Sequence, residues 1–428
     1  MTFSPSARVY ALGVIMCVAL TICSLNWADR GGPFFLACLA VAGVSYLLTI
    51  CEFFSTSRFP RRVVVVGLAV AGVWHLAFLR LPTGRDDDIR RYVWDGRVQR
   101  LGYNPYVVVP SDPAVRALHT AETRSLNNAG VPSPYPAGAQ LFFRVVTAIH
   151  ESTFALKIAF VLCDLAIVLM LLDVLRRERR EAHWVLAYAW NPLLAIEVAG
   201  SGHVDIVAAL LLVVSFAALG RRWRAIAAVS LGLAVAVKLL PAVLLPLYWK
   251  RVRARDAVLA AVVVAFLYLP FLDHGRLPFG SLGTYIQVFR FNDPVFAKLV
   301  RVARPPIVTG FAVLIGLLAA TFLRLSSAEF SPDAFAWPMA ASLFCAPVVY
   351  PWYLLSLLPF VRSAATLPLV IWTVTIIPTY VIWHLRTLGR PWLLPGWVML
   401  IEYGPVAAAG VVLLLRRLAQ SFNQEERS

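Results

Sequence analysis

The chain has 428 residues, of which 60% are hydrophobic and only 14% are charged. A water-soluble or disordered chain of this length needs far more polar surface, so the composition excludes both classes. The formal net charge is +16. The arginines nevertheless stand in short clusters between apolar runs, which is typical of cytoplasmic loops and gives no reason to expect a nucleic-acid partner.

Apolar runs long enough to cross about 30 Å of hydrocarbon recur from Arg8 to Arg417. They predict an all-α fold, a polytopic transmembrane bundle of roughly 11–14 membrane segments that forms one domain. We treat 1–428 as that domain and expect spans at 8–28, 33–54, 62–81, 154–175, 183–200, 204–219, 224–249, 256–272, 306–324, 334–361, 365–385 and 396–415.

The basic segment that contains Arg58, Arg61 and Arg62 is expected in the cytoplasm, and two crossings back place the N-terminus there as well. The third span then leads out of the cytoplasm. We therefore expect 82–153 to be a large non-cytoplasmic loop and 273–305 to be a second one. Continuing the alternation places the C-terminus in the cytoplasm.

Two apolar runs contain prolines that are expected to break them. A single crossing from 224 to 249 would put the cations of 250–255 outside, whereas a hairpin broken at Lys238-Leu-Leu-Pro241 keeps both basic ends inside. The same reasoning breaks 334–361 between Pro347 and Pro351. Broken helices at membrane depth need protein or a water-filled cavity around them, so both breaks are expected beside a site.

The densest polar cluster begins directly after the third span with three consecutive aspartates, Asp86, Asp87 and Asp88. Apolar and aromatic residues follow at helical spacing over 88–101, so this segment predicts a juxtamembrane helix along the membrane surface. One carboxylate would suffice to cap that helix. Adjacent carboxylates raise one another's pKa, which suits a general base for a sugar or lipid hydroxyl, and both roles remain open.

Ionisable residues also occur inside the later spans. Glu197 and Lys157 lie within apolar runs, where charge is costly and is expected to face a functional cavity, and Asp164 is expected to pair with Lys157. His203 and Asp205 stand at helix ends, where they belong either to the same cavity or to solvent.

The loop 273–305 carries more cations than a non-cytoplasmic loop should. Arg290 and Arg301 fit a lipid-linked phosphate, because guanidinium groups bind phosphate oxygens bidentately. Alternatively, these side chains only extend to the membrane interface. The six cysteines show no metal-ligand spacing, so no cofactor is expected, and a divalent metal, although chemically compatible, is not indicated.

Several of these motifs resemble a known family. Asp87-Asp88 followed by Tyr92-Val-Trp-Asp-Gly-Arg-Val-Gln resembles the first outer loop of bacterial GT-C glycosyltransferases of the polyprenyl-phosphate-mannose-dependent mannosyltransferase type. Ser201-Gly-His-Val-Asp205 and Lys238-Leu-Leu-Pro241 follow in the order found in the eukaryotic mannosyltransferase that adds the first mannose to glycosylphosphatidylinositol. Tyr350-Pro-Trp-Tyr353 resembles an aromatic motif of the bacterial members.

The resemblance covers about 85–360. It implies an inverting membrane enzyme that moves a hexose, with mannose the first candidate, from a polyprenyl-phosphate donor to a lipid or glycan acceptor outside a bacterial plasma membrane. It implies a carboxylate base at Asp87, with Asp88 and Asp86 as alternatives. Donor-phosphate ligands are expected at Lys238, Arg290 and Arg301. The sugar or acceptor pocket is expected to contain Tyr92, Asp95, Tyr135, Glu197, His203, Asp205 and Trp352.

Two alternatives belong to other classes of protein. A transporter or flippase for lipid-linked sugars is disfavoured, because the chain has no two-fold hydropathy repeat and its polar residues gather at one face instead of the midplane. The aspartates disfavour a non-catalytic subunit of a glycosylation complex. The expected partners are therefore the sugar donor, the acceptor and membrane lipids.

Overall fold

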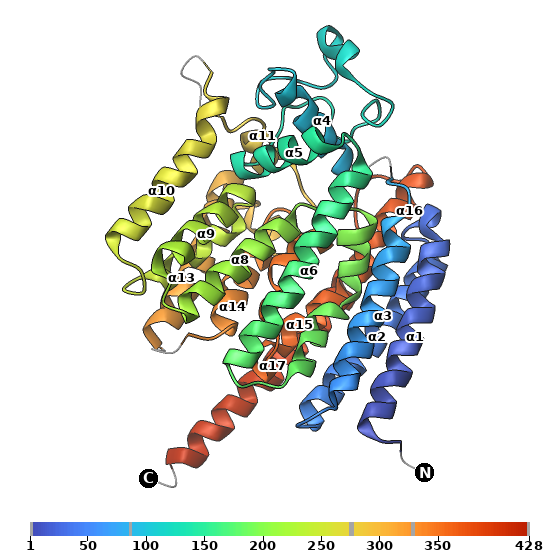
Figure 1. The fold of residues 1–428 in the computed structure, drawn as a ribbon, viewed down its shortest axis with the longest axis vertical. Helices are drawn as coiled ribbons and strands as arrows, with labels where there is room; N and C mark the ends of the chain where they lie inside the picture. Colours follow the sequence, from blue (N-terminus) through green and yellow to red (C-terminus); the bar gives the residue numbers. More distant parts are fainter. Residues whose placement is uncertain (1–2, 85–87, 274–277, 327–329, 426–428) are drawn as a thin grey trace.

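The computed structural model describes residues 3–84, 88–273, 278–326 and 330–425, so Asp86 and Asp87 lie outside the described residues. Throughout this part of the chain the architecture is helical and contains no β-strand, which confirms the predicted all-α bundle (Figure 1). An isolated parallel β-bridge joins Phe291 to Val348.

The α-helices follow one another with short connections in most places. They are α1 (Pro5–Leu25), α2 (Pro33–Ser55), α3 (Arg61–Leu79), α4 (Ile89–Arg100), α5 (Ala137–Ile149), α6 (Thr153–Arg177), α7 (Val185–Ala189), α8 (Asp205–Gly220), α9 (Arg224–Val237), α10 (Ala254–Tyr268), α11 (Leu282–Val288), α12 (Phe296–Leu299), α13 (Pro305–Ser326), α14 (Asp333–Phe344), α15 (Leu367–Thr375), α16 (Val381–Thr387) and α17 (Gly396–Glu425).

Tighter and wider helical turns join these helices. The 3-10 turns are Trp27–Asp29, Pro113–Leu118, Ala182–Trp184, Leu240–Tyr248, Leu269–Phe271, Pro351–Ser356, Leu358–Phe360, Ala364–Thr366 and Ile377–Tyr380, and a π-helical turn spans Leu194–Gly200.

Eight helices within the described ranges are long and apolar enough to cross a membrane, or nine if the bent pair Leu194–Gly200 and Asp205–Gly220 is one span. That pair turns through 114°. The apolar helices α5 and α9 are shorter. Several predicted segments are therefore present as short or broken helices, because prolines interrupt them.

Both predicted proline breaks are confirmed. Helix α9 ends at Val237, Lys238 is extended with φ −144° and ψ 136°, and the 3-10 turn Leu240–Tyr248 carries Pro241 in its first turn and Pro246 inside. Helix α14 ends at Phe344, and the next turn begins at Pro351. Each break leaves backbone groups outside a regular helix, and both lie beside the polar residues described below.

The two ends of the bundle differ in character. Helices α4 and α5 and the loop between them cover one end, and both chain termini lie at the other (Figure 1). Helix α3 begins at Arg61 and α6 ends at Arg177, both at the end that holds the termini. Asp88 and these basic clusters therefore lie at opposite ends, as the predicted alternation requires.

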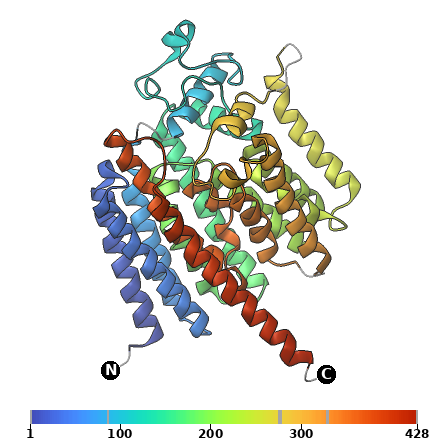
Figure 2. The same cartoon turned by 180° about the vertical axis from the view of Figure 1, so that it is seen from behind.

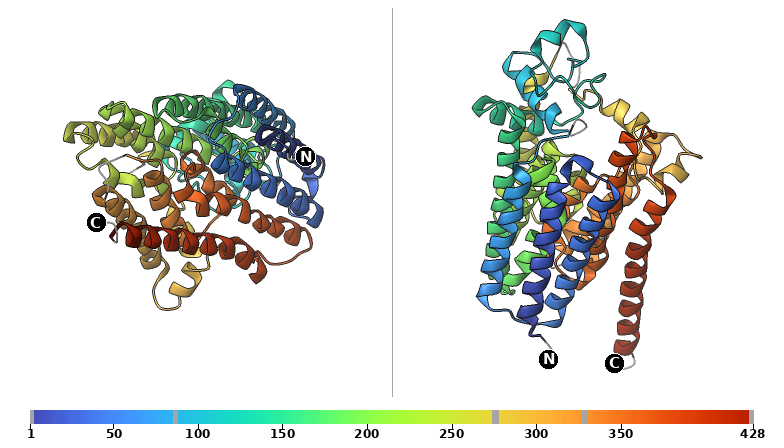
Figure 3. Two further views of the ribbon diagram at one scale, coloured as in Figure 1. Left: turned by 90° about the horizontal axis from the view of Figure 1, so that it is seen from below. Right: turned by 90° about the vertical axis from the view of Figure 1, so that its right-hand side faces the viewer.

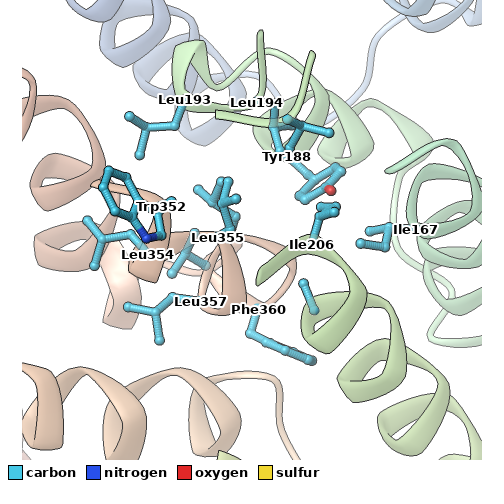
Figure 4. Close-up of a cluster of buried hydrophobic side chains, with 14 of the residues drawn as sticks. Ile167, Tyr188, Leu193, Leu194, Ile206, Trp352, Leu354, Leu355, Leu357 and Phe360 are labelled. Atoms are coloured by element: carbon cyan, nitrogen blue, oxygen red, sulfur yellow. The ribbon is translucent and has the colours of Figure 1, made fainter. Parts of the chain in front are cut away.

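Helix α17 runs across the back of the bundle (Figure 2) and stands to one side of it (Figure 3). It packs mainly on α15. The hydrophobic core instead lies where α6, α7 and α8 meet the chain from Trp352 to Phe360, with Tyr188, Leu194 and Ile206 facing Leu355 and its neighbours (Figure 4). This core supports the bend between the π-helical turn and α8.

Candidate active site

Helix α4 lies over the end of the bundle and brings Asp88 and Tyr92 to one face, since they are four residues apart. Ile89, Tyr92 and Val98 are fully buried, as the predicted apolar spacing requires. Trp94 is also fully buried and stacks on His119 with ring centroids 4.1 Å apart. The loop after α4 thus covers the side of the helix that carries Trp94.

Asp88 occupies the N-cap position of α4, but its side chain makes no capping hydrogen bond. Its Oδ1 accepts a hydrogen bond from Nδ2 of Asn127 at 2.6 Å. The carboxylate also lies within electrostatic range of Tyr92, Tyr135 and Asp205. For Asp88 the geometry therefore favours a position in a charged cluster over a helix-capping role.

Two tyrosines lie near this carboxylate, Tyr92, which is buried, and Tyr135, which is half-buried. The Tyr92 ring stacks on Phe143 at 4.4 Å and meets the Tyr135 ring edge-on at 5.1 Å. Burial, followed by the nearby Asp88 charge, raises the pKa of both phenols well above the usual value. Both hydroxyls therefore stay protonated at neutral pH and can donate hydrogen bonds.

The proline break in the seventh predicted span brings a cation to this cluster. Nζ of Lys238 lies 3.1 Å from Oδ1 of Asp205. Oδ2 of Asp205 is buried without a hydrogen-bond partner among the described residues. We call Asp88, Tyr92, Tyr135, Asp205 and Lys238 the charged cluster.

The second proline break supplies an aromatic wall, Tyr350, Trp352 and Tyr353. Nζ of Lys238 lies 4.5 Å from the centroid of the Tyr353 ring, close enough for a cation–π interaction. The Tyr353 hydroxyl lies 2.6 Å from that of Tyr285. Tyr350 stacks on Trp352 at 4.3 Å, which fixes the orientation of the wall.

A polar cavity adjoins the wall and is lined by Arg30, Glu197, Ser201, His203, Trp352, Tyr380 and Trp383. The His203 ring lies 3.9 Å from the Trp352 ring, and its Nδ1 is 3.5 Å from Oε2 of Glu197. Tyr380 donates a hydrogen bond to Oε1 of Glu197. Nε2 of His203 and Nε1 of Trp383 are buried without hydrogen-bond partners among the described residues, so polar groups of a ligand could bind them.

The link 200–203 holds this cavity and α4 together. Gly202 has φ +79°, a left-handed conformation that suits glycine. A Cβ atom at this position would lie 2.5 Å from Cδ1 of Ile89, the first residue of α4. The bend before α8 and the start of α4 are therefore in direct contact.

Three of the predicted site residues lie away from this cluster. Asp95 is fully buried, and its carboxylate accepts hydrogen bonds from Arg91, Ser133 and Gln140 at 2.5–3.0 Å. The Arg290 guanidinium donates to the carbonyls of its own helix end, and Arg301 is exposed. Asp95 thus has a structural environment, and neither arginine is held toward Lys238.

The expected pair between Lys157 and Asp164 is wrong. The Asp164 carboxylate lies 3.2 Å from Nε2 of His75 and accepts a hydrogen bond from Tyr188. Lys157 is 1% exposed and donates to the carbonyl of Leu81 at 2.8 Å, just after α3 ends. Both arrangements satisfy buried polar groups across helices that the sequence does not show to be neighbours.

Sequence reasoning missed four residues of the site: Arg30, Tyr285, Tyr380 and Trp383. Arg30 follows the first span and had a usable signal, because a cation next to a helix end that we predicted to be non-cytoplasmic is unexpected. The other three belong to aromatic-rich segments without a distinguishing pattern. Within the described residues no group of three or more His, Cys, Asp or Glu side chains could hold a metal ion.

The fold and the site define a polytopic helical membrane protein with a charged cluster, an aromatic wall and a buried polar cavity at one end. A search of curated proteins finds no match. The family model described as alpha-(1->6)-mannopyranosyltransferase, N-terminal domain, matches residues 12–252, more than half of the chain. The chain belongs to this family and is a glycosyltransferase, which agrees with the resemblance and leaves the transporter alternative unsupported.

Proposed function

We propose that the protein transfers a mannosyl residue from a polyprenyl-phosphate donor to a lipid or glycan acceptor, with inversion at the anomeric carbon. The pairing of Lys238 with Asp205 beside Asp88 carries this proposal. This arrangement places a cation that can bind a phosphate close to a carboxylate that can accept a proton from a hydroxyl, at one end of a membrane-embedded bundle. A polyprenyl carrier remains in the bilayer, so its phosphate reaches such a site at the membrane interface.

The reaction needs a base on one side of the sugar and a stabilised leaving group on the other. A carboxylate of the aspartate trio, with Asp87 the first candidate and Asp88 and Asp86 the alternatives, removes the proton from the acceptor hydroxyl. The resulting oxygen bonds to the anomeric carbon as the bond to the donor's phosphate oxygen breaks. Lys238 neutralises the departing polyprenyl phosphate. Arg290 and Arg301 remain secondary candidates, because each would have to move toward the donor.

In this proposal the sugar binds against the residues that line the polar cavity, which must open further to admit it. Trp352 offers an aromatic face for a pyranose ring, and Glu197 and His203 offer buried polar atoms for its hydroxyl groups. Tyr92 and Tyr135 supply neutral phenolic donors from the opposite side. Asp205 connects the charged cluster with the polar cavity, because it pairs with Lys238 and lies two residues after His203 in the chain. This proposal needs no metal, because fixed side chains supply the charge.

The proposed orientation places both termini in the cytoplasm and the site at the outer face of a bacterial plasma membrane. Support comes from the basic ends of α3 and α6, which lie opposite the charged cluster. The loops 82–153 and 273–305 then lie outside, where a polyprenyl-linked donor is the natural sugar source since nucleotide sugars are cytoplasmic.

Replacing each aspartate in turn tests the base. Asp87→Asn should abolish transfer while folding and donor binding persist, because the amide keeps the shape but cannot accept the proton. Asp88→Asn and Asp86→Asn identify the base if Asp87→Asn remains active. The matched control is Asp112→Asn in the same loop, since Asn retains the side-chain oxygen that accepts from the Ala114 amide at 2.9 Å. Full activity in all three aspartate variants would overturn the proposal.

A further inference from the structure

Helix α17 contains a buried carboxyl group in an otherwise exposed span. Only 11% of its apolar window is buried, yet Glu402 is 0% exposed. A carboxyl group inside a membrane span is costly to insert, and such residues normally have a function. The reaction proposed above does not use Glu402, so its position requires another explanation.

Glu402 accepts hydrogen bonds from two partners in different parts of the chain. Nε1 of Trp372 in α15 donates to Oε1 at 2.7 Å. Nδ2 of Asn292, in the second outer loop, lies 3.0 Å from Oε1 and 2.9 Å from Oε2. Glu402 therefore connects α15, α17 and the outer loop at one point.

Asn292 continues this connection to the aromatic wall. Its Nδ2 also lies 3.3 Å from the Val349 carbonyl. The neighbouring residue Phe291 accepts from the Val349 amide at 2.9 Å and donates to the Pro347 carbonyl at 3.2 Å. Asn292 has φ +53°, a left-handed backbone conformation that costs free energy in a residue other than glycine. The hydrogen bonds around Asn292 must offset this cost.

Contacts between aromatic rings connect Phe291, through the aromatic wall, to the rest of the site. Phe291 stacks on Tyr350 at 4.4 Å, and Tyr350 stacks on Trp352 at 4.3 Å. Trp352 lies against His203, and Tyr353 lies beneath Lys238. Every step from Glu402 to the charged cluster is thus a direct contact between buried or half-buried groups.

We propose that Glu402 is a positioning residue for glycosyl transfer, which holds the aromatic wall in place through Asn292 from outside the site. The inference rests on the proposed function, because it takes the wall and Lys238 as parts of the active site. Glu402 touches neither substrate in this arrangement. It holds Asn292, whose side chain in turn donates to the Val349 carbonyl in the segment 345–350, which lies between α14 and the 3-10 turn Pro351–Ser356.

Two substitutions of similar size separate hydrogen bonding from packing. Glu402→Leu removes both acceptors, which leaves Nε1 of Trp372 unpaired and Nδ2 of Asn292 with only the Val349 carbonyl, so kcat per folded molecule should fall roughly 10-fold or more through misplacement of the wall. Glu402→Gln keeps Oε1, which accepts from both partners, and loses only the second contact of Asn292, the one to Oε2, so kcat should stay within about 3-fold of wild type by the same reasoning. Wild-type kcat in Glu402→Leu, or equal losses in both variants, would overturn the proposal.

A double-mutant cycle tests the route through Asn292. Asn292→Gly tolerates the positive φ and removes the amide, so it should resemble Glu402→Leu, and the double variant should be no worse than either single one. Additive losses would contradict the route. Tyr188→Phe, which removes a buried hydrogen bond to Asp164 away from the wall, serves as control and should lower thermal stability without changing kcat.

The same assay distinguishes this inference from the proposed function. If Lys238→Met loses transfer while Glu402→Leu retains it, the positioning role is wrong and the site stands. If Lys238→Met retains transfer, the charged cluster is not the site and the proposed function fails.

Discussion

Substitutions at Lys238 and Asp205, which form an ion pair, can separate an effect on folding stability from an effect on catalysis. The Nζ–Oδ1 distance is 3.1 Å, and the side chains are 19% and 1% exposed. Removing one partner of a buried pair costs about 3–5 kcal/mol, and the partial exposure of Lys238 places this pair near the lower limit. Lys238→Met should therefore lower the free energy of unfolding by about 2–3 kcal/mol.

The catalytic effect of the same substitution should be larger. If Lys238 neutralises the leaving phosphate, its removal should lower kcat by about 100-fold or more, as for other groups that stabilise developing charge. Adding Asp205→Leu removes the unpaired carboxylate and should restore most of the lost stability. Transfer should not return, because the phosphate still has no cation.

Proteoliposomes supplied with radiolabelled polyprenyl-phosphate mannose would measure transfer, and thermal unfolding in detergent would measure stability. Lys250→Met replaces an exposed cation outside the charged cluster and should change neither quantity. Transfer that recovers together with stability in the double variant would refute the reasoning, since the pair would then be structural alone.

Two further predictions concern pH and orientation. Burial raises the pKa of Tyr92 and Tyr135, so the folded state binds their protons more tightly than the unfolded state, in which tyrosine titrates near pH 10. Their contribution to the free energy of unfolding is complete below pH 10 and is lost as the pH rises further. Tyr92→Phe should therefore flatten this decline. An unchanged pH profile of thermal unfolding in that variant would contradict the assigned burial of Tyr92. In a background without the six native cysteines, Gly130→Cys should react with a membrane-impermeant reagent on intact cells. Gly220→Cys, equally exposed and with equal space for a side chain, should react only after permeabilisation, and the opposite result would invert the topology.

Local signals in the sequence were sufficient for the eight long apolar helices and for the two proline breaks. The break at Lys238 follows from Pro241 and from the basic residues on both sides of the run, all within one segment. The positions of Asp205 at a helix end and Lys238 at a proline break drew attention to both residues, but their predicted roles in a site came from the resemblance to the GT-C family. Their pairing could not be predicted, because it depends on how a bend of 114° before α8 faces the end of α9.

Other residues show where sequence reasoning fails. Asp95 stands in a motif full of functional candidates, and only the packing of Arg91, Ser133 and Gln140 around it reveals a structural environment. Glu402 carried a signal, an ionisable residue within 396–415, that we did not use because the run otherwise has the composition of a plain span. Its partners are 110 and 30 residues away in sequence, so only the fold identifies them.

The absence of a side chain at Gly202 has a consequence for the end of the bundle that α4 covers. Because Ile89 occupies the space that a Cβ atom would need, the first residue of α4 packs directly on the backbone of the bend at Gly202. Even the single methyl group of an alanine at position 202 would push Ile89 and the bend apart. The contact between Ile89 and Gly202, which carries no reactive group, therefore limits how closely α4 and the bend before α8 can approach each other.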